Sequence, residues 1–199
     1  MLTRLCVIGD AFQDVWLTAV AKRRSAEAPI DIYDVTTKRV QPGGAYNVVR
    51  AISLLDPNTV VLKWFTGSDF EMPIKTRIVV NGQQVCRFDM HDQCYKFKIT
   101  NPEYITGKDV VISDYNKGYL TYDDIETISN SHPLTFIDTK KSIDHRMKNY
   151  SFIKINEVEW EACKGQNYTD WTGKLIVTMS ERGAMFDGVT YPVDNSAEV

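Results

Sequence analysis

The sequence predicts an α/β protein with a doubly wound, mostly parallel sheet and helices on both faces. Short apolar runs that end at small or acidic residues recur along the chain, and the first of them, residues 5–8, stops at Gly9-Asp10. Such runs are typical of strands that are buried on both faces of a parallel sheet. Segments with the helical i, i+3, i+4, i+7 spacing of apolar residues separate several of these runs, which indicates β-α units.

The chain of 199 residues has the length of one domain, and its 43% apolar and 25% charged residues are an average globular composition. The formal net charge of −3 gives no reason to expect nucleic acid or an anionic membrane as a partner. No apolar run approaches the ~20 residues that a membrane helix needs, and a strand pattern starts too early for a signal peptide. We therefore expect a single domain over residues 1–199.

The cysteines indicate a reducing, cytoplasmic setting. Cys6, Cys86, Cys94 and Cys163 have no C-x-x-C spacing and lie mostly inside apolar patterns, as reduced core thiols do. The three histidines are scattered, so a structural zinc site is not expected.

Residues 30–40 alternate in a way that suits neither a buried parallel strand nor a helix. This polar-flanked ribbon is typical of a flap that covers a site or pairs with a second subunit. The apolar stripe of Ala45–Leu55 predicts a helix, and Val60–Phe65 has the pattern of a buried strand.

A tight hairpin is predicted next. Residues 75–80 and 84–89 flank Asn81-Gly82, a dipeptide that favours such a turn because both positions tolerate positive φ. Only residues 70–73 join this hairpin to the preceding strand, so the β-α alternation breaks here and antiparallel or flap structure is expected.

The alternation resumes in the second half of the chain, which supports the parallel sheet. Strands are expected at 110–113, 135–138, 152–155 and 175–179. Helices are expected near 122–131, 142–148 and 157–164. A terminal hairpin is expected around Gly188.

The run Gln41-Pro42-Gly43-Gly44-Ala45-Tyr46-Asn47 lies between the ribbon and the first helix. Two adjacent glycines let backbone N–H groups approach a polar ligand closely, and Asn47 falls in the first helical turn. Turn and cap chemistry is the alternative explanation for these glycines.

Polar residues follow the predicted strands. Open α/β sheets bind ligands outside the carboxyl ends of their strands, so Asp10 and Asp14 are well placed, although a turn or helix cap is the alternative for Asp10. Short carboxylates and amides bind sugar hydroxyls, while lysines and magnesium-binding acids balance phosphate charge, so a polyol with a phosphate suits the whole set. The set is Asp10, Asp14, Asn47, Asp114, Lys117, Asp138, Lys140, Asn156 and Glu159.

A series of motifs covers nearly the whole chain. In order, they are VIGDAFQDVW, RRSAEAPI, QPGGAYNV, TGSD, PIKTRIVVNGQQVCRFD, VVISDYNKGYLT, IDTKK, INEVEWEA and VTMSERGAMF. Together they resemble the ribokinase-like (PfkB) carbohydrate kinases, and SDYNKG with NGQQVCRFD makes the heptose-phosphate kinase domains of ADP-heptose synthases the most similar branch. The resemblance implies a ribokinase-like fold with a small β-lid and ATP-dependent phosphoryl transfer to a heptose phosphate or related sugar.

The resemblance also implies site residues. The implied sugar contacts are Asp14, Gly43, Gly44 and Asn47. The residues implied near the substrate or its phosphate are Lys75, Arg77 and Arg87, with Asp114 and Lys117 at the sugar–phosphate junction. An ordinary surface charge is an equal alternative for Lys75, Arg87 and Lys140.

On the nucleotide side the resemblance implies ATP and Mg²⁺. Asp138 and Lys140 would lie there, and Asn156 would lie at the magnesium and triphosphate with Glu159, the metal-binding residue. The nucleotide pocket would be lined by Thr178, Ser180, Glu181 and Gly183. Residues 30–41 and 75–89 would form the β-lid, which in these kinases also pairs two subunits, so a homodimer is expected.

The chain departs from the family pattern in two places. Helix and strand units are missing near residues 69–73, so the sheet should be smaller on one side. The family follows the 184–192 region with an Asp-Thr-x-Gly-Ala-Gly-Asp segment, which holds the transferring phosphate and supplies the general base, whereas this sequence has Asn195-Ser196-Ala197-Glu198-Val199. We therefore expect a catalytically incomplete chain, unless Asp138, Glu198 or another polypeptide supplies the missing groups.

Two other functions are open. The chain could be a non-catalytic sugar-phosphate or nucleotide binder that keeps the lid for ligand capture or dimer formation. It could also be a degenerate fragment that folds and binds no ligand, which the absence of sugar-phosphate binding in calorimetry would indicate.

Overall fold

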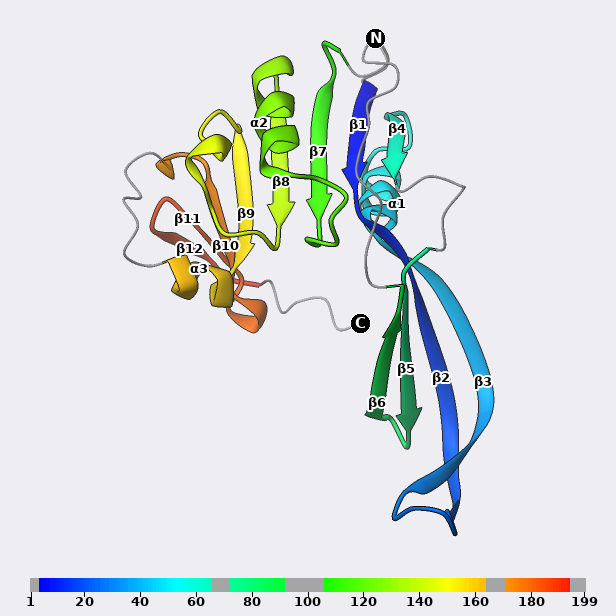
Figure 1. Ribbon diagram of the computed structural model, residues 1–199. Helices are drawn as coiled ribbons and strands as arrows, with labels where there is room; N and C mark the ends of the chain where they lie inside the picture. Colours follow the sequence, from blue (N-terminus) through cyan, green and yellow to red (C-terminus); the bar gives the residue numbers. More distant parts are fainter. Residues whose placement is uncertain (1–3, 66–71, 92–105, 164–170, 194–199) are drawn as a thin grey trace.

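The computed structural model describes residues 4–65, 72–91, 106–163 and 171–193 and contains two sheets. The larger sheet has eight strands in the order β12-β11-β10-β9-β8-β7-β1-β4, and the smaller has the order β3-β2-β5-β6. Figure 1 shows the larger sheet as the body of the molecule and the smaller sheet as an arm that extends away from it.

Six neighbouring strands of the larger sheet are parallel, and the last two add as an antiparallel hairpin. The strands are β1 (Arg4–Gly9), β4 (Val60–Phe65), β7 (Asp109–Asp114), β8 (Thr135–Thr139), β9 (Phe152–Asn156), β10 (Leu175–Thr178), β11 (Ala184–Phe186) and β12 (Val189–Tyr191). The predicted mostly parallel sheet is confirmed. β4 forms one edge, on the side where the sequence predicts a smaller sheet.

Helices cover both faces of this sheet, as predicted. They are α1 (Ala45–Leu55), α2 (Tyr122–Ser131) and α3 (Glu157–Cys163), with the short 3-10 helices η2 (His145–Met147) and η4 (Ser180–Arg182). In Figure 1, α1 lies behind β1 and α2 lies in front of β8. Neighbouring residues of a strand point to opposite faces, so Ile8 joins the buried cluster that contains Ile128 of α2, while Val7 joins the cluster of Val49 on α1.

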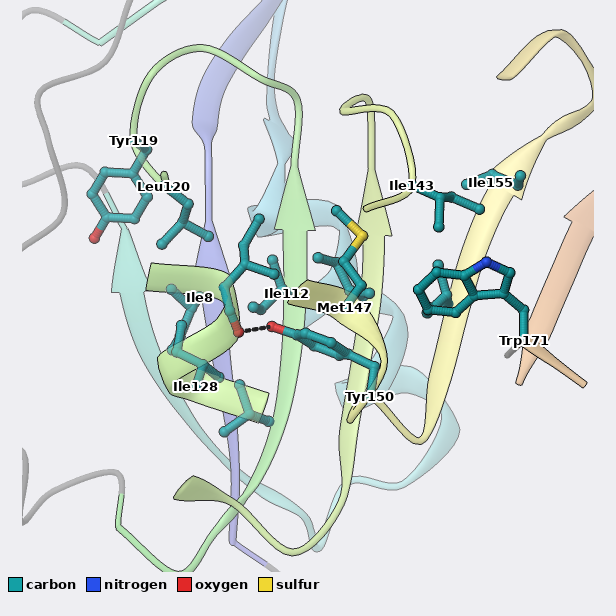
Figure 2. Close-up of a cluster of buried hydrophobic side chains, with 14 of the residues drawn as sticks. Ile8, Ile112, Tyr119, Leu120, Ile128, Ile143, Met147, Tyr150, Ile155 and Trp171 are labelled. Atoms are coloured by element: carbon teal, nitrogen blue, oxygen red, sulfur yellow. Dashed lines mark hydrogen bonds between the residues drawn. The ribbon is translucent and has the colours of Figure 1, made fainter. Parts of the chain in front are cut away.

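The larger of these clusters is the main core. Many of its side chains come from the strands, from α2 and from the segment around η2, as Figure 2 shows for Ile112, Ile128 and Met147. The Tyr150 hydroxyl is buried there and donates a hydrogen bond to the Ile125 carbonyl of α2 at 2.9 Å (Figure 2). This bond satisfies a polar group that would otherwise be costly to bury.

The arm consists of β2 (Ala11–Arg24), β3 (Asp31–Gly44), β5 (Ile74–Val80) and β6 (Gln83–Met90). The β5–β6 hairpin turns at Asn81 and Gly82, whose φ values of 50° and 79° confirm the predicted tight turn. β2 was not predicted. It carries an alternation of Val15, Leu17 and Ala19 that could have revealed it, and it pairs with β3 and in parallel with β5.

Two sequence expectations differ from the structure. The short helix expected near 142–148 is the single 3-10 turn η2, which the Asp144 carboxylate caps by accepting from the Arg146 backbone N–H. Cys86 is not a core thiol but is exposed on β6. Cys6 and Cys163 are buried as expected, and Cys94 lies outside the described residues.

In the part of the chain that the structure describes, no helix is long and apolar enough to cross a membrane.

Candidate functional site

Asp10 joins three segments just beyond the carboxyl end of β1. Its carboxylate accepts hydrogen bonds from the backbone N–H groups of Tyr115 (2.6 Å) and Lys117 (3.4 Å), in the turn after β7. Its carbonyl oxygen accepts from the Ala45 N–H at the start of α1, at 2.9 Å. Asp10 is 1% exposed, so its first role is to hold the turn and the helix entrance against β1.

The glycine pair packs against the same region. A Cβ atom on Gly43 would overlap the Asp14 carboxylate and the Phe12 ring, and one on Gly44 would overlap the Asp10 carbonyl oxygen. Gly44 also has φ 61°, a conformation that other residues rarely adopt. The internal packing therefore requires glycine at both positions, whether or not a ligand also approaches them.

Two charged residues of the arm meet at its base. Arg77 Nη1 lies 2.5 Å from Asp14 Oδ1, and both side chains are 17% exposed. The Arg77 guanidinium also stacks 4.7 Å from the centre of the Trp16 ring. Asp14 is thus held in place by a half-buried ion pair.

Lys75 is the most distinctive cation of the site, because it is only 7% exposed. Its Nζ lies 3.5 Å from the centre of the Phe12 ring and 4.8 Å from that of Tyr115. Burial lowers the pKa of Lys75, and the charges of Lys117 and Arg87 lower it further, against the opposing effect of Asp14 and Asp89. The surroundings disfavour the lone ammonium, so an anionic group bound there would be stabilised.

Three other residues, from β6, from the turn after β7 and from α1, belong to the predicted substrate side or adjoin it. Arg87 donates two hydrogen bonds to Asp89, at 2.8 and 2.7 Å, on the exposed strand β6. Burial raises the pKa of Tyr115, and the charges of Asp138, Asp14 and Asp10 raise it further. Asn47 is exposed on the first turn of α1. Of the predicted substrate residues, Asp10 and Lys75 therefore both contact the turn after β7.

Asp114 differs from its expected role. Its side chain is fully buried and is enclosed by other protein groups, among them Lys141, whose Nζ lies 2.9 Å from both carboxylate oxygens. The Thr139 hydroxyl donates to the same carboxylate at 2.6 Å. A ligand at the predicted junction would meet the backbone of this turn and Lys117 before it met the Asp114 carboxylate.

Asn156 and Glu159 cap α3 on the predicted nucleotide side. The Glu159 N–H donates to Asn156 Oδ1 at 2.8 Å, and the Asn156 N–H donates to Glu159 Oε2 at 2.7 Å. The Lys140 ammonium lies 2.6 Å from Glu159 Oε1 and brings β8 and β9 together at their carboxyl ends. These three predicted residues form one cluster.

A cavity of about 680 Å³ opens next to this cluster. Its lining includes Asn156 and three more of the predicted nucleotide residues, Thr178, Ser180 and Gly183. The fourth predicted residue of this loop, Glu181, is exposed on η4. Ligand pockets typically have volumes of roughly 300–1,000 Å³, so the cavity has room for a nucleotide.

Comparisons with solved structures identify the fold. The chain superposes on a ribokinase from Thermotoga maritima with a TM-score of 0.62, at 11% identity, over 97% of this chain and 77% of that one. It superposes on Arabidopsis thaliana ribokinase complexed with ribose and ATP with a TM-score of 0.64, at 12% identity, over 100% of this chain and 80% of that one. It superposes on Escherichia coli phosphofructokinase-2 in complex with fructose-6-phosphate with a TM-score of 0.60, at 16% identity, over 97% of this chain and 80% of that one.

Curated relatives add evidence from sequence. The bifunctional protein HldE of Nitratiruptor sp. is 27% identical over 94% of this chain and 50% of its own length, and HldE of Helicobacter pylori J99 is 27% identical over 93% and 51%. The chain therefore has the fold of the ribokinases and is similar in sequence to HldE. It spans about half the length of the curated relatives it matches. No family model matches the chain.

The carboxylates of this ribokinase-like chain are largely paired with cations. Asp138, a candidate substitute base, has Oδ2 at 2.8 Å from Lys154 Nζ. The other candidate, Glu198, lies outside the described residues.

A metal ion held by protein groups alone does not fit the described part of the chain, in which no group of three His, Cys, Asp or Glu side chains could bind one. Glu159 Oε1 already accepts from Lys140 and from Asn156 Nδ2, at 2.6 and 2.9 Å. Mg²⁺ at kinase sites usually keeps several waters and is held by one or two carboxylates with the substrate phosphates. Both Glu159 oxygens already have protein partners, so Glu159 would have to give up one of them to hold such an ion.

Three residues of the site were missed in the sequence. Tyr115 directly follows Asp114 and Phe12 lies between Asp10 and Asp14, and these positions were the available signal. Lys141 gave no signal, because its partner Asp114 is 27 residues away and only the pairing of β7 with β8 brings them together.

Proposed function

We propose that this chain is a sugar-kinase-like protein that binds a heptose phosphate or a related sugar phosphate at the base of the arm, together with ATP and Mg²⁺ beside α3. The observation that carries the proposal is the buried Lys75 ammonium between Phe12 and Tyr115, with Asp14 close by. The resemblance of SDYNKG and NGQQVCRFD to heptose-phosphate kinase domains favours a sugar phosphate over an unmodified sugar. The similar phosphofructokinase-2 was solved with a sugar phosphate, fructose-6-phosphate.

Each part of the ligand has matching groups. The Asp14 carboxylate and the Asn47 amide suit sugar hydroxyls, while Lys75, Arg87 and Lys117 suit a phosphate. The nucleotide cavity lies beside β9, three strands from β1, or about 14 Å at the usual strand spacing. A triphosphate that extends from this cavity could cross the carboxyl ends of β8 and β7 toward the sugar.

We further propose that the chain alone transfers phosphate slowly, if at all. A general base must accept a proton from a sugar hydroxyl, but Asp14, Asp114 and Asp138 are each held in ion pairs with cations. An ATP-consumption assay with a heptose phosphate tests this, and turnover at roughly 1–100 s⁻¹, the normal kinase range, would contradict it. The same ion pairs favour a non-catalytic sugar-phosphate binder as the second candidate function.

The Asp14→Ala variant is expected to bind the sugar phosphate more weakly by about 1–3 kcal/mol, because a sugar hydroxyl loses its charged acceptor. Asn47→Ala should act in the same direction. Calorimetric titration with a heptose or hexose phosphate measures both effects. Asp31→Ala, which removes an exposed carboxylate at the far end of β3, is the control. Unchanged affinity in Asp14→Ala and Asn47→Ala would count against the pocket.

We propose that the arm also pairs two copies of the chain. Both of its edge strands, β3 and β6, are unpaired on one side within the described chain, and exposed strand edges need cover. Val40 and Phe88, 48% and 43% exposed, lie on one face of the arm, because their strand partners Val15 and Thr76 pair with each other. An apolar face of this kind suits a homodimer.

Sedimentation velocity at micromolar concentration is expected to show a dimer, and Val40→Glu with Phe88→Glu is expected to shift it toward the monomer by placing charges in the interface. Leu54→Glu, at an exposed apolar position on α1, is the matched control and should remain dimeric. A wild-type chain that sediments as a monomer would contradict pairing through the arm.

We also propose a cytoplasmic location, which suits the two buried free thiols.

A further inference from the structure

We propose that Lys141 is a positioning residue that joins the sugar side of the site to the nucleotide side through Asp114. The identity of the two ligands in this inference rests on the proposed function, whereas the contacts of Lys141 do not depend on it. Lys141 belongs neither to the predicted site residues nor to the residues that line the nucleotide cavity.

The link is a closed set of contacts between β7 and β8. The Lys141 ammonium lies 2.9 Å from both Asp114 oxygens, the Thr139 hydroxyl donates to Oδ2 at 2.6 Å, and the Asn116 N–H donates to Oδ1 at 3.0 Å. The side chains of Lys141 and Asp114 are 7% and 0% exposed. The two charged groups already bind each other, so we infer that they act through the backbone they hold.

The sugar side is held through the turn that follows β7. Asn116, whose N–H is bound to Asp114, has φ 56°, a left-handed conformation that Asn adopts more readily than most residues and that the bond to Asp114 helps to hold. The flanking N–H groups of Tyr115 and Lys117 point to Asp10. The Asp114 carboxylate therefore fixes the turn that carries the Tyr115 ring and the Lys117 ammonium.

The nucleotide side is held through the segment that follows β8. The Lys140 N–H donates to the Asp114 carbonyl at 2.9 Å, and the Lys141 N–H donates to the Thr139 hydroxyl at 3.0 Å. Lys140 then reaches Glu159 with its ammonium. One buried ion pair thus fixes residues that face both proposed ligands, and ordering one half of the site should favour the other half.

The set of contacts around Lys141 and Asp114, here called the clamp, is tested by hydrogen exchange of the ligand-free protein. The double variant Lys141→Met/Asp114→Asn removes both charges together, so no buried charge is left unpaired and the fold is kept. We expect the amides of residues 115–118 and of Lys140 to exchange at least tenfold faster in this variant. Thr135→Val is the matched control, since it removes a buried hydroxyl that accepts from Ser151 at the opposite end of β8. Exchange within twofold of wild type at residues 115–118 overturns the inference.

The coupling is tested by calorimetry with fructose 6-phosphate as the probe, titrated with and without a saturating non-hydrolysable ATP analogue. In wild type, we expect the analogue to tighten sugar-phosphate binding by about fivefold or more, a usual size for coupling between sites. The ratio of the sugar-phosphate affinities with and without the analogue should fall to about one in Lys141→Met/Asp114→Asn. It should return toward the wild-type value in Lys141→Arg, whereas a merely structural role would leave the ratio unchanged in all variants. Equal ratios in wild type and the double variant overturn the inference. If wild type binds neither ligand, the proposed function fails, and the exchange experiment still decides on the clamp.

Discussion

The Lys141→Met variant is expected to lose about 3–5 kcal/mol of the free energy of unfolding, because it leaves the fully buried Asp114 carboxylate without its cation. Thr139 and the Asn116 N–H would still donate to that carboxylate but could not balance its charge. Urea denaturation followed by circular dichroism measures the loss.

The double variant Lys141→Met/Asp114→Asn separates the ion pair from its packing. We expect it to regain most of the stability that the single variant loses, since replacing both members of a buried pair is often close to neutral. A single variant within about 1 kcal/mol of wild type would show that Asp114 is not dependent on Lys141.

The second large effect is expected for Gly44→Ala, with a loss of about 3 kcal/mol of unfolding free energy. The new Cβ would overlap the Asp10 carbonyl oxygen and press on the Phe12 ring, at a position where φ is 61°. Strained backbone and overpacking each cost about 1–3 kcal/mol. The clash would also displace Asp10 from the Ala45 N–H, so sugar-phosphate affinity should fall as well.

Gly82→Ala is the matched control for this effect. Gly82 also has a positive φ, 79°, but a Cβ atom added there would meet nothing within 4 Å, so only the conformational cost of roughly 1–2 kcal/mol is expected. Equal losses in the two variants would mean that the contact with Asp10 is unimportant.

The regular part of the fold could be predicted from the sequence because its signals are local. Val60–Phe65 shows its apolar run and Tyr122–Ser131 its helical spacing within a few residues, and Asn81-Gly82 favours its own tight turn. The strand β2 was missed because Trp16 and Val20, on the face opposite to Val15, Leu17 and Ala19, obscure the alternation. Sequence patterns are most informative where a segment is buried on a whole face.

The site was predictable in part. Acidic residues at the ends of strands could be recognised, since topology brings the ends of parallel strands to one edge. The same reasoning could not tell which carboxylates face a ligand and which are buried in ion pairs. Asp114 and Lys141 show the limit, because their pairing depends on the register of β7 against β8 and on the path of the chain after Thr139.

The binding of a phosphorylated sugar at the base of the arm is tested most directly by calorimetric titration of a heptose 7-phosphate into wild type and Lys75→Met. Lys22→Met, which removes an exposed lysine near the tip of the arm, serves as the control. We predict that wild type and the control bind alike and that Lys75→Met binds more weakly by about 1.5–3 kcal/mol, the usual value of a hydrogen bond to a charged group. No measurable binding by wild type, or equal affinity in Lys75→Met, would contradict the account.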